Sequence, residues 1–257
     1  MIEIRHRAVT DGGSIRQAYN DFFRERKISM RDSFYLWLLE VAEVRAGQLL
    51  IDVACGNGRL VQLAAERGIR AIGLDLAIEG ISEAAQVGKQ AHWLVGDGQR
   101  LPVPDRCADV VMSIGSLEHY DNPATGAAQL ARVVTPGGIV CILLPNAFGA
   151  LGNILHVVRR GEVFDDKQPV QRYASRQTWE TMLTHGGLQI ERIIPFNEFN
   201  RPRTSKDIIW TAMRPQKIAK GIIAHAIPLN LANHFVFLCR AAGNVPAQRH
   251  HYPMLPY

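Results

Sequence analysis

The sequence contains few cysteines and no long apolar segment, and both absences narrow what the chain can be. Its four cysteines are spread over 257 residues without a C-x-x-C pair, at Cys55, Cys107, Cys141 and Cys239. Neither the spacing of a zinc site nor a disulfide framework appears among them, so we expect no metal site and a reducing compartment. No apolar run approaches the ~20 residues of a membrane span, and the opening MIEIRHRAVTDGG lacks an apolar signal core. We therefore expect a cytoplasmic location.

The chain also lacks a large excess of charge of either sign. Its formal net charge is +5, and 47% of its residues are hydrophobic and 21% charged, which is typical of a globular protein. At 257 residues, we expect one α/β domain with insertions and a sizeable core. The small positive excess suits an acidic or membrane-surface partner but does not require one.

What the chain does contain is a glycine-rich turn between an apolar stretch and a helical pattern. The stretch Leu49–Leu60 reads LLIDVACGNGRL. Its apolar residues predict a buried strand over Leu49–Val53, and the spacing in Arg59–Arg67 predicts a helix. Glycines let the backbone N–H groups at a helix N-terminus approach an anionic or polar ligand. Strand, glycine turn and helix in this order therefore favour a ligand site.

Acidic residues end the next two predicted strands. Asp75 follows the apolar stretch Ile69–Leu74, and Asp97 follows His92–Gly96, with a helix predicted between them over Ala77–Gly88. In a parallel sheet these strand ends lie side by side at the carboxyl edge, where α/β proteins bind ligands. A carboxylate there can accept hydrogen bonds from both hydroxyls of a ribose.

A dinucleotide fingerprint is the first alternative, because Gly56-Asn57-Gly58 is a G-x-G. Val61 stands where that fingerprint requires a third glycine or alanine, and an acidic residue just before the turn, Asp52, is foreign to it. Binding of NAD is therefore improbable.

Several segments together resemble the class I S-adenosylmethionine-dependent methyltransferases, in particular the small-molecule branch that includes the ubiquinone and menaquinone methyltransferases. They read IDVACGNG, VGDGQRLPVPD, DVVMSIGSLEHYDNP and LARVVTPGGIVCILLPN, and the resemblance is strongest over Leu49–Pro145. It implies an α/β fold: a seven-stranded, doubly wound, Rossmann-like sheet with an antiparallel seventh strand and helices on both faces. Asp109–Ile114, Ile139–Leu144, Leu188–Ile194 and His234–Arg240 would be strands four to seven.

The resemblance also implies S-adenosyl-L-methionine as cofactor, with S-adenosyl-L-homocysteine as product. Asp75 would hold the ribose, and Asp97 with the backbone that follows it would hold the adenine. The first motif of the family is usually D-x-G-x-G-x-G, and here Ala54 and Cys55 replace the first Gly-x. The complete set of implied cofactor residues is Asp52, Ala54, Cys55, Gly56, Gly58, Asp75, Leu76, Gly96, Asp97, Gly98, Ser113 and Ile114.

The acceptor pocket would be built by segments outside these motifs. Residues 1–45 are expected to form an N-terminal helical cap, and residues 46–257 the methyltransferase core, with insertions at about 146–174 and 196–232 and a flexible tail from about 244. A long connection at the ligand edge of a sheet is usually a functional element. The candidate acceptor contacts are Tyr19, Tyr120, Asn146, Arg172 and Tyr173, although Tyr19 has the helical spacing of an ordinary buried contact.

Two histidines are candidates for a catalytic base. His119 follows the fourth predicted strand, at the same edge as the acidic residues, and a neutral imidazole can remove a proton from a hydroxyl. His156, in a predicted helix over Leu151–Arg160, is the second choice. The alternative is that Glu118 and His119 only orient their loop through hydrogen bonds.

The segment between the sixth and seventh predicted strands is basic and amphipathic. Six cations and interleaved isoleucines fall between Arg201 and Ile223, with Trp210 among them. Such a segment can lie on an anionic membrane or contact a lipid-linked substrate, and the alternative is an ordinary surface helix pair with solvated lysines. The tail holds His250-His251, which is weak grounds for a metal site.

The sequence therefore predicts a methyltransferase that acts on an oxygen of a small molecule or of a lipid- or sugar-linked intermediate. Methylation of nitrogen or carbon, or a non-catalytic module that binds S-adenosylmethionine, are the alternatives. A nucleic-acid substrate is disfavoured, because no N-P-P-Y-type motif follows the fourth strand, which ends Ser113-Ile114-Gly115-Ser116. The identity of the acceptor and the oligomeric state cannot be read from this sequence.

Overall fold

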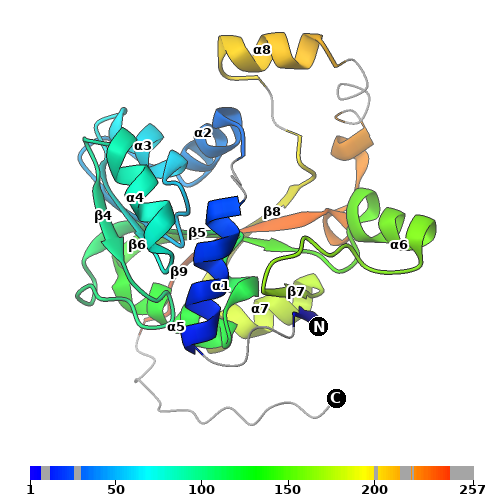
Figure 1. The fold of residues 1–257 in the computed structure, drawn as a ribbon, viewed down its shortest axis with the longest axis horizontal. Helices are drawn as coiled ribbons and strands as arrows, with labels where there is room; N and C mark the ends of the chain where they lie inside the picture. Colours follow the sequence, from blue (N-terminus) through cyan, green and yellow to red (C-terminus); the bar gives the residue numbers. More distant parts are fainter. Residues whose placement is uncertain (7–11, 26–29, 200–201, 215–220, 222, 244–257) are drawn as a thin grey trace.

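A seven-stranded sheet forms the centre of the molecule (Figure 1), as seen in a computed structural model that describes residues 1–6, 12–25, 30–199, 202–214, 221 and 223–243. Its strand order is β4-β3-β2-β5-β6-β9-β8. The strands are β2 (Leu49–Val53), β3 (Arg70–Asp75), β4 (His92–Val95), β5 (Ala108–Ile114), β6 (Val134–Pro145), β8 (Leu188–Phe196) and β9 (His234–Ala241). Neighbours pair in parallel except β9, which runs antiparallel to both β6 and β8. The predicted seven-stranded fold with an antiparallel seventh strand is confirmed.

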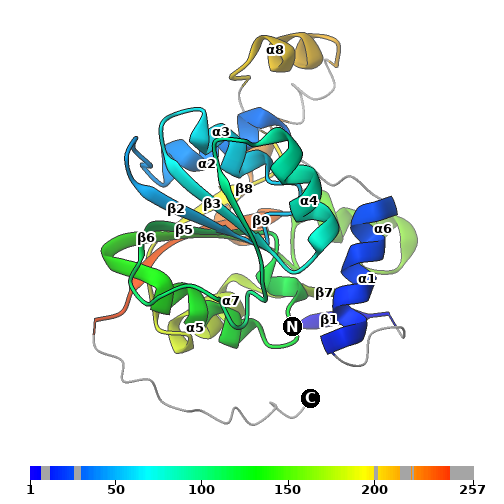
Figure 2. The same ribbon diagram turned by 60° about the vertical axis from the view of Figure 1, so that its left-hand side comes forward.

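Helices cover both faces of this sheet because successive residues of each strand point to opposite sides. In β2, Leu50 packs with α2 (Asp32–Val41) and α3 (Arg59–Ala65), whereas the next residue, Ile51, packs on the side of α5 (Pro123–Val133) and α7 (Arg176–His185). Helix α4 (Ile78–Val87) covers β3 and β4, and α1 (Gly12–Glu25) lies against α4 (Figure 2). The two apolar clusters fix the sheet between two helical layers.

The insertion after β6 contains structure that the sequence did not predict. The expected helix is divided into a π-helical turn, η2 (Ala150–Ile154), and α6 (Leu155–Arg160). The segment then forms β7 (Val170–Tyr173), which pairs antiparallel with β1 (Ile2–Arg5) at the other end of the chain. A strand of four residues next to the N-terminus carries too short a pattern to be recognised from sequence. The N-terminus and the insertion are thereby joined.

The basic segment after β8 contains α8 (Ser205–Ala212), which lies apart from the sheet in both ribbon views (Figures 1 and 2). Salt bridges from Arg203 to Glu40, and from Arg31 to Asp207, connect its start to α2. A short 3-10 turn, η3 (Leu229–Leu231), leads into β9. The predicted tail with its two histidines, and Arg201, Lys217 and Lys220, lie outside the described residues.

Two further observations concern the absences in the sequence. All four cysteines are free thiols. No helix within the described ranges has the length and apolar character needed to cross a bilayer.

Candidate functional site

The glycine turn after β2 adopts the backbone conformation that the sequence motif requires. Gly56 and Gly58 have φ angles of 53° and 73°, and Ala54 has a φ of 61°, a left-handed conformation that glycine adopts far more readily than alanine. Gly58 precedes α3, and a Cβ there would lie 2.2 Å from the Trp93 ring. The indole therefore closes the underside of the turn, where only glycine fits.

Asp75 at the end of β3 ties this turn to the next strand. One carboxylate oxygen accepts a hydrogen bond from the Gly56 N–H and the other from the Ala77 N–H, both at 2.8 Å. Asp75 is buried, and burial raises its pKa while the backbone donors oppose the rise. At the end of β4, Asp97 accepts a hydrogen bond from the Gln99 N–H at 2.8 Å. Both carboxylates stand at the carboxyl edge of the sheet, as predicted.

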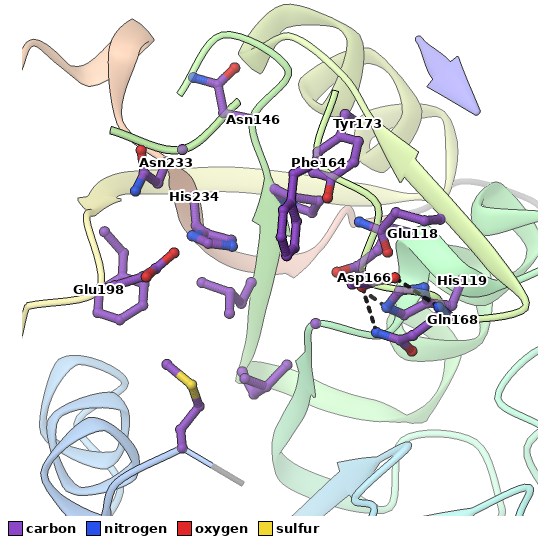
Figure 3. Close-up of a pocket in the computed structure, with 18 of the residues that line it drawn as sticks. Glu118, His119, Asn146, Phe164, Asp166, Gln168, Tyr173, Glu198, Asn233 and His234 are labelled. Carbon is purple, nitrogen blue, oxygen red and sulfur yellow. Dashed lines mark hydrogen bonds and ion pairs between the residues drawn. The ribbon is translucent and has the colours of Figure 1, made fainter. Parts of the chain in front are cut away.

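A cavity of about 860 Å³ opens beside the turn. Residues from the carboxyl ends of β2, β5 and β6 line it, as do parts of the insertion and of the segment between β8 and β9. Apolar side chains also line it, among them Leu143 and Phe196, and Phe164 lies between its two polar ends (Figure 3). Polar groups gather at two ends: Glu118, His119, Asp166 and Gln168 lie on one side, and Glu198, Asn233 and His234 on the other (Figure 3).

His119 is held in one orientation by the backbone of β7. Its Nδ1 lies 2.6 Å from the carbonyl oxygen of Val170, which can only accept, so Nδ1 carries the proton and donates. The other ring nitrogen, Nε2, is then the unprotonated one. Burial lowers the pKa of His119, so the ring is neutral near pH 7. A neutral imidazole with a lone pair on Nε2 therefore lines the cavity.

Glu118 accompanies this imidazole. Its Oε1 lies 3.8 Å from Nε2 of His119, and its Oε2 is buried with no hydrogen-bond partner within the described part of the chain. Burial raises the pKa of Glu118 to about 8, so its carboxyl group is mostly protonated at neutral pH. A second buried acceptor, Oε1 of Gln171, also has no partner among the residues that the structure describes, and Gln171 lines the same cavity.

The structure brings about half of the predicted site residues into the lining of the cavity. These are Asp52, Ala54, Cys55, Gly56, Ile114, His119, Asn146, His156 and Tyr173. The predicted cofactor residues Gly58, Asp75, Leu76, Gly96, Asp97, Gly98 and Ser113 lie outside that lining, on the same edge of the sheet or beneath the turn. Ser113 is fully buried and shares a hydrogen bond of 2.6 Å with the Ser116 hydroxyl.

The structure does not support Arg172 as an acceptor contact. Its buried guanidinium donates to the carboxylate of Glu3 at 2.7 Å and to the carbonyls of Glu118, Tyr120 and Asp121. The N–H donors of the guanidinium therefore bond β1 and the loop that carries His119. Arg172 therefore positions that loop, and the sequence could not show this because the partners lie 51 or more residues away.

Tyr19 and Tyr120 also lie outside the cavity lining. Tyr19 packs against Ile15 and Val170 between α1 and β7. The Tyr120 ring covers Gly98, where an added Cβ would lie 2.0 Å from the phenolic oxygen. Tyr120 therefore packs against the loop that carries Asp97.

Asn146 lines the cavity, but its side chain is occupied by the backbone. The amide nitrogen donates to the carbonyls of Asn230 and Ala232, and the amide oxygen accepts from the Phe148 N–H. Asn153 adds a hydrogen bond to the carbonyl of Asn146 at 3.2 Å. These amides join the insertion to the start of β9, so the role of the Asn146 side chain is structural.

Sequence reasoning missed Asn233 and His234 as site residues. Both line the cavity, and Oδ1 of Asn233 and Nδ1 of His234 are buried without a hydrogen-bond partner in the ranges that the structure describes. The only signal in the sequence was an Asn-His pair directly before the last predicted strand, which is too common a pattern to identify a site.

Comparison with known proteins agrees with this geometry. Residues 51–142, which contain the glycine turn, Asp75, Asp97 and His119, match the family model of a methyltransferase domain. Over these residues the chain is therefore similar to methyltransferase domains. The matched segment runs from β2 into β6, the half of the sheet whose carboxyl edge forms the turn and the cavity.

Curated relatives of the chain match over part of their lengths. The chain is 33% identical over 103 residues to malonyl-[acyl-carrier protein] O-methyltransferase of Serratia marcescens, covering 40% of each chain. It is 26% identical over 174 residues to 27-O-demethylrifamycin SV methyltransferase of Amycolatopsis mediterranei, covering 63% of this chain and 62% of the relative. The chain thus spans about half the length of such relatives.

Solved structures show the same fold. The [4+2]-cyclase SpnF aligns with a TM-score of 0.61 at 16% identity, covering 90% of this chain and 94% of the other. The CcbJ methyltransferase of Streptomyces caelestis aligns with a TM-score of 0.59 at 14% identity, covering 87% and 96%. At these identities the likeness concerns the fold alone.

Proposed function

We propose that the chain transfers a methyl group from S-adenosyl-L-methionine to an oxygen atom of a small molecule, or of a lipid- or sugar-linked intermediate. The observation that supports an oxygen acceptor is His119, a neutral imidazole with one nitrogen fixed to Val170 and the other available in the cavity. A hydroxyl must lose its proton to become a strong nucleophile, and a neutral imidazole accepts a proton near neutral pH. S-adenosyl-L-homocysteine would be the second product.

The charge beside the glycine turn supports this cofactor, which carries a sulfonium and an ammonium group. Asp52 lines the cavity and is 4% exposed, and among the described residues no cation forms a salt bridge with it. Burial, with a further contribution from the nearby Asp75, raises the pKa of Asp52 to about 8. A buried carboxylate without a cation is unfavourable, and a cationic ligand would remove this cost.

We assign the remaining cofactor contacts to the turn and the adjoining strand ends. The backbone of Ala54, Cys55, Gly56 and Gly58 would surround the methionine end, and Asp75 and Leu76 would hold the ribose. The adenine would lie against Gly96, Asp97 and Gly98, with Ser113 and Ile114 below the reacting end. These assignments rest on the common edge that β2, β3, β4 and β5 share.

The protein's own groups then have defined tasks. When bound, S-adenosyl-L-methionine supplies an activated methyl carbon and its leaving group, so the protein mainly binds and orients. Nε2 of His119 takes the proton from the acceptor hydroxyl as the oxygen attacks, and Nδ1–H stays on the Val170 carbonyl. The ring becomes positive beside Glu118, 3.8 Å away, and this charge favours ionisation of the Glu118 carboxyl group. Glu118 thereby stabilises the protonated imidazole.

The names of the relatives favour oxygen over nitrogen or carbon as the acceptor atom. The Serratia relative is named an O-methyltransferase, and the Amycolatopsis relative acts on a 27-O-demethyl compound by its name. His156 stays the second candidate for the base: it lines the cavity, and its ring contacts the edge of Phe164 at 5.5 Å between centroids.

The test compares methyl transfer by the wild type, His119→Ala and His156→Ala, with a library of hydroxylated and aminated small molecules as acceptors. S-adenosyl-L-homocysteine formation is the readout, and mass spectrometry identifies the methylated atom. We expect an O-methylated product and a fall in kcat of about 10²–10⁴-fold for His119→Ala, with unchanged affinity for S-adenosyl-L-methionine by calorimetry. His156→Ala tests the second candidate: if His119 is the base, this variant should keep most of the wild-type turnover.

Equal loss of turnover and cofactor affinity in His119→Ala, or no loss of either, would remove His119 from this role. Methylation of nitrogen or carbon would favour the alternative chemistry. Cofactor binding without product from any acceptor would favour a non-catalytic module.

A further inference from the structure

The cavity has a second polar end, on the other side of Phe164 from His119 (Figure 3). Asn233 and His234 form it at the start of β9, where His234 pairs with Phe196 of β8 and Pro145 of β6. The two residues therefore sit between two neighbouring strands of the sheet. The proposed reaction uses neither of them.

The side chain of Asn233 is enclosed by the insertion. A Cβ on Gly149 would lie 2.8 Å from the Cα of Asn233, and a Cβ on Gly152 would lie 3.2 Å from its Oδ1. Gly152 also breaks the helical conformation inside η2, with φ −103° and ψ −107°. Two glycines and a kink thus bring the insertion onto Asn233, which is 7% exposed.

The backbone of Asn233 is fully paired, whereas its side-chain oxygen is not. Its N–H donates to Oδ1 of Asn197 at 2.8 Å, and its carbonyl accepts from the Asn146 N–H at 2.9 Å. Oδ1 of Asn233 is buried without a partner in the described part of the chain. Leaving such an acceptor unpaired costs about 1–3 kcal/mol, and the cavity is where a partner can come from.

The ring of His234 presents the second unpaired atom. It packs against Phe196 at 6.0 Å between centroids, and Phe196 packs on Phe34 and Trp37 of α2. Nδ1 is buried without a partner in the described ranges, and burial lowers the pKa of the ring, while the Glu198 carboxylate opposes this. A neutral ring adjacent to Oδ1 of Asn233 and the Glu198 carboxylate forms an end rich in hydrogen-bond acceptors.

We propose that Asn233 and His234 form a second acceptor subsite that binds a hydroxyl or N–H group of the methyl acceptor. The acceptor would then be an elongated molecule with the methylated oxygen at the His119 end, an apolar middle, and a hydrogen-bond donor at the other end. This inference rests on the proposed function for the first end, but the subsite itself is defined by Asn233 and His234. Its occupant is recognised by donation to Oδ1 of Asn233, because an amide oxygen can only accept a hydrogen bond.

The test measures binding of paired phenols that differ by one distal donor. The pairs are hydroquinone with phenol, 4-(hydroxymethyl)phenol with p-cresol, and 4,4′-dihydroxybiphenyl with 4-hydroxybiphenyl, which together cover a range of lengths. Dissociation constants come from ligand-observed NMR with the full chain. We expect at least one pair in which the second donor tightens binding by about two- to tenfold, the value of one hydrogen bond.

The variants Asn233→Leu and His234→Phe keep the size and shape of these side chains and remove the unpaired atoms. Both should abolish the gain from the second donor while leaving the affinity for the single-donor phenol unchanged. His156→Phe is the matched control: the same substitution at another histidine of the cavity should preserve the gain. Circular dichroism and thermal unfolding establish that each variant is folded. If one of the two subsite variants does not fold, the other still tests the subsite.

A gain that persists in both subsite variants, or no gain for any pair in the wild type, would overturn the subsite. Because binding is measured without methyl transfer, the outcomes separate. A gain without any methylated product would contradict the proposed function and retain the subsite. Methyl transfer without a gain would retain the function and remove the subsite.

Discussion

The glycine-turn edge and the acceptor side of the cavity are held in place in different ways. At the turn, backbone groups do most of the work: Asp75 accepts from the N–H groups of Gly56 and Ala77, and glycines provide the unusual φ angles. On the acceptor side, side chains reach across long stretches of sequence, from Arg172 to Glu3 and from Asn146 to Ala232. A backbone-held site leaves a local sequence motif, whereas a site held by long-range side-chain contacts does not.

The largest effect that this comparison predicts is on stability, at Arg172. Arg172→Met removes hydrogen bonds from a buried guanidinium to three carbonyls, and its salt bridge to the partly exposed Glu3. Leaving buried acceptors unpaired costs about 1–3 kcal/mol, whereas a partly exposed ion pair contributes less. We expect the free energy of unfolding, measured with urea, to fall by about that amount. Glu3→Gln should cost less, because Glu3 is partly exposed and the carbonyl contacts persist. A stable Arg172→Met variant with a raised KM would instead make Arg172 an acceptor contact.

The next effect is a pH dependence of cofactor binding that originates at Asp52. Its pKa of about 8 in the free protein should fall when a cationic ligand binds. Binding therefore releases a proton below pH 8, and affinity for S-adenosyl-L-methionine rises as the pH increases toward 8, by up to about tenfold per unit. Calorimetry in buffers of different ionisation enthalpy measures the number of protons released and the affinity at each pH.

Asp52→Asn is the control for that dependence. The ligand titrates in the same way in experiments with the variant and with the wild type. The difference between the two pH profiles of affinity therefore isolates the contribution of Asp52. We expect the variant to bind about tenfold or more weakly at pH 8 and to lose the proton release. Identical pH profiles would show that Asp52 does not face the cation.

Asp52 also affects the stability of the free protein. Its folded-state pKa of about 8 lies above the ~3.9 of an unperturbed aspartate, so the folded state binds more protons than the unfolded state between these values. The free energy of unfolding of the ligand-free protein should therefore decrease as the pH rises from about 4 to about 8. Thermal unfolding over this range, with Asp52→Asn for comparison, measures this contribution. An identical slope in the two proteins would contradict it.

A smaller effect is expected at Ala54, the residue that replaces the first glycine of the family's motif. Its φ of 61° costs an alanine roughly 1–2 kcal/mol relative to glycine. Ala54→Gly removes this conformational cost from the folded state. Glycine also gives the unfolded chain more freedom, which offsets part of the effect, so we expect a net stabilisation of about 1 kcal/mol. Thermal unfolding measures it, and a destabilised variant would show that the methyl group of Ala54 contributes packing instead.

The smallest effect concerns α8. Ile208, Ile209 and Met213 are 60%, 61% and 74% exposed on a helix that lies apart from the sheet (Figure 1). Arg203 is paired with Glu40, and Arg214 lies over the Trp210 ring, so neither described arginine is fully available to lipid. We expect the chain to co-sediment only slightly more with phosphatidylglycerol vesicles than with phosphatidylcholine vesicles, and Ile208→Ser/Ile209→Ser to remove the difference. Equal, negligible binding to both lipids would end the membrane-surface hypothesis.

The sequence predicted the fold because its strands carry strong local patterns. Leu49–Val53 is apolar on both sides and is buried between two helical layers, and each acidic strand end marks the carboxyl edge of the sheet. The β1–β7 pair escaped prediction because four residues carry little pattern and their partner is more than 160 residues away. The contact of Tyr120 with Gly98 escaped prediction for a related reason: Gly98 lies on another loop, and only the folded chain shows the contact.

The candidate site divides in the same way. His119 could be proposed from sequence because it follows a strand at the predicted edge, but the Val170 carbonyl that fixes its tautomer comes from the insertion. Asn233 and His234 had no motif, and they become candidates only through their unpaired atoms and the glycines packed against them. Chemistry that depends on which groups lack partners is visible only in the structure.

The most direct test of the central claim is a crystal structure of the chain with S-adenosyl-L-homocysteine. We predict that this product binds along the glycine turn, with the ribose hydroxyls on Asp75, its amino group toward Asp52, and its sulfur facing the part of the cavity lined by His119. Binding elsewhere, or a sulfur atom directed away from His119, would contradict the account.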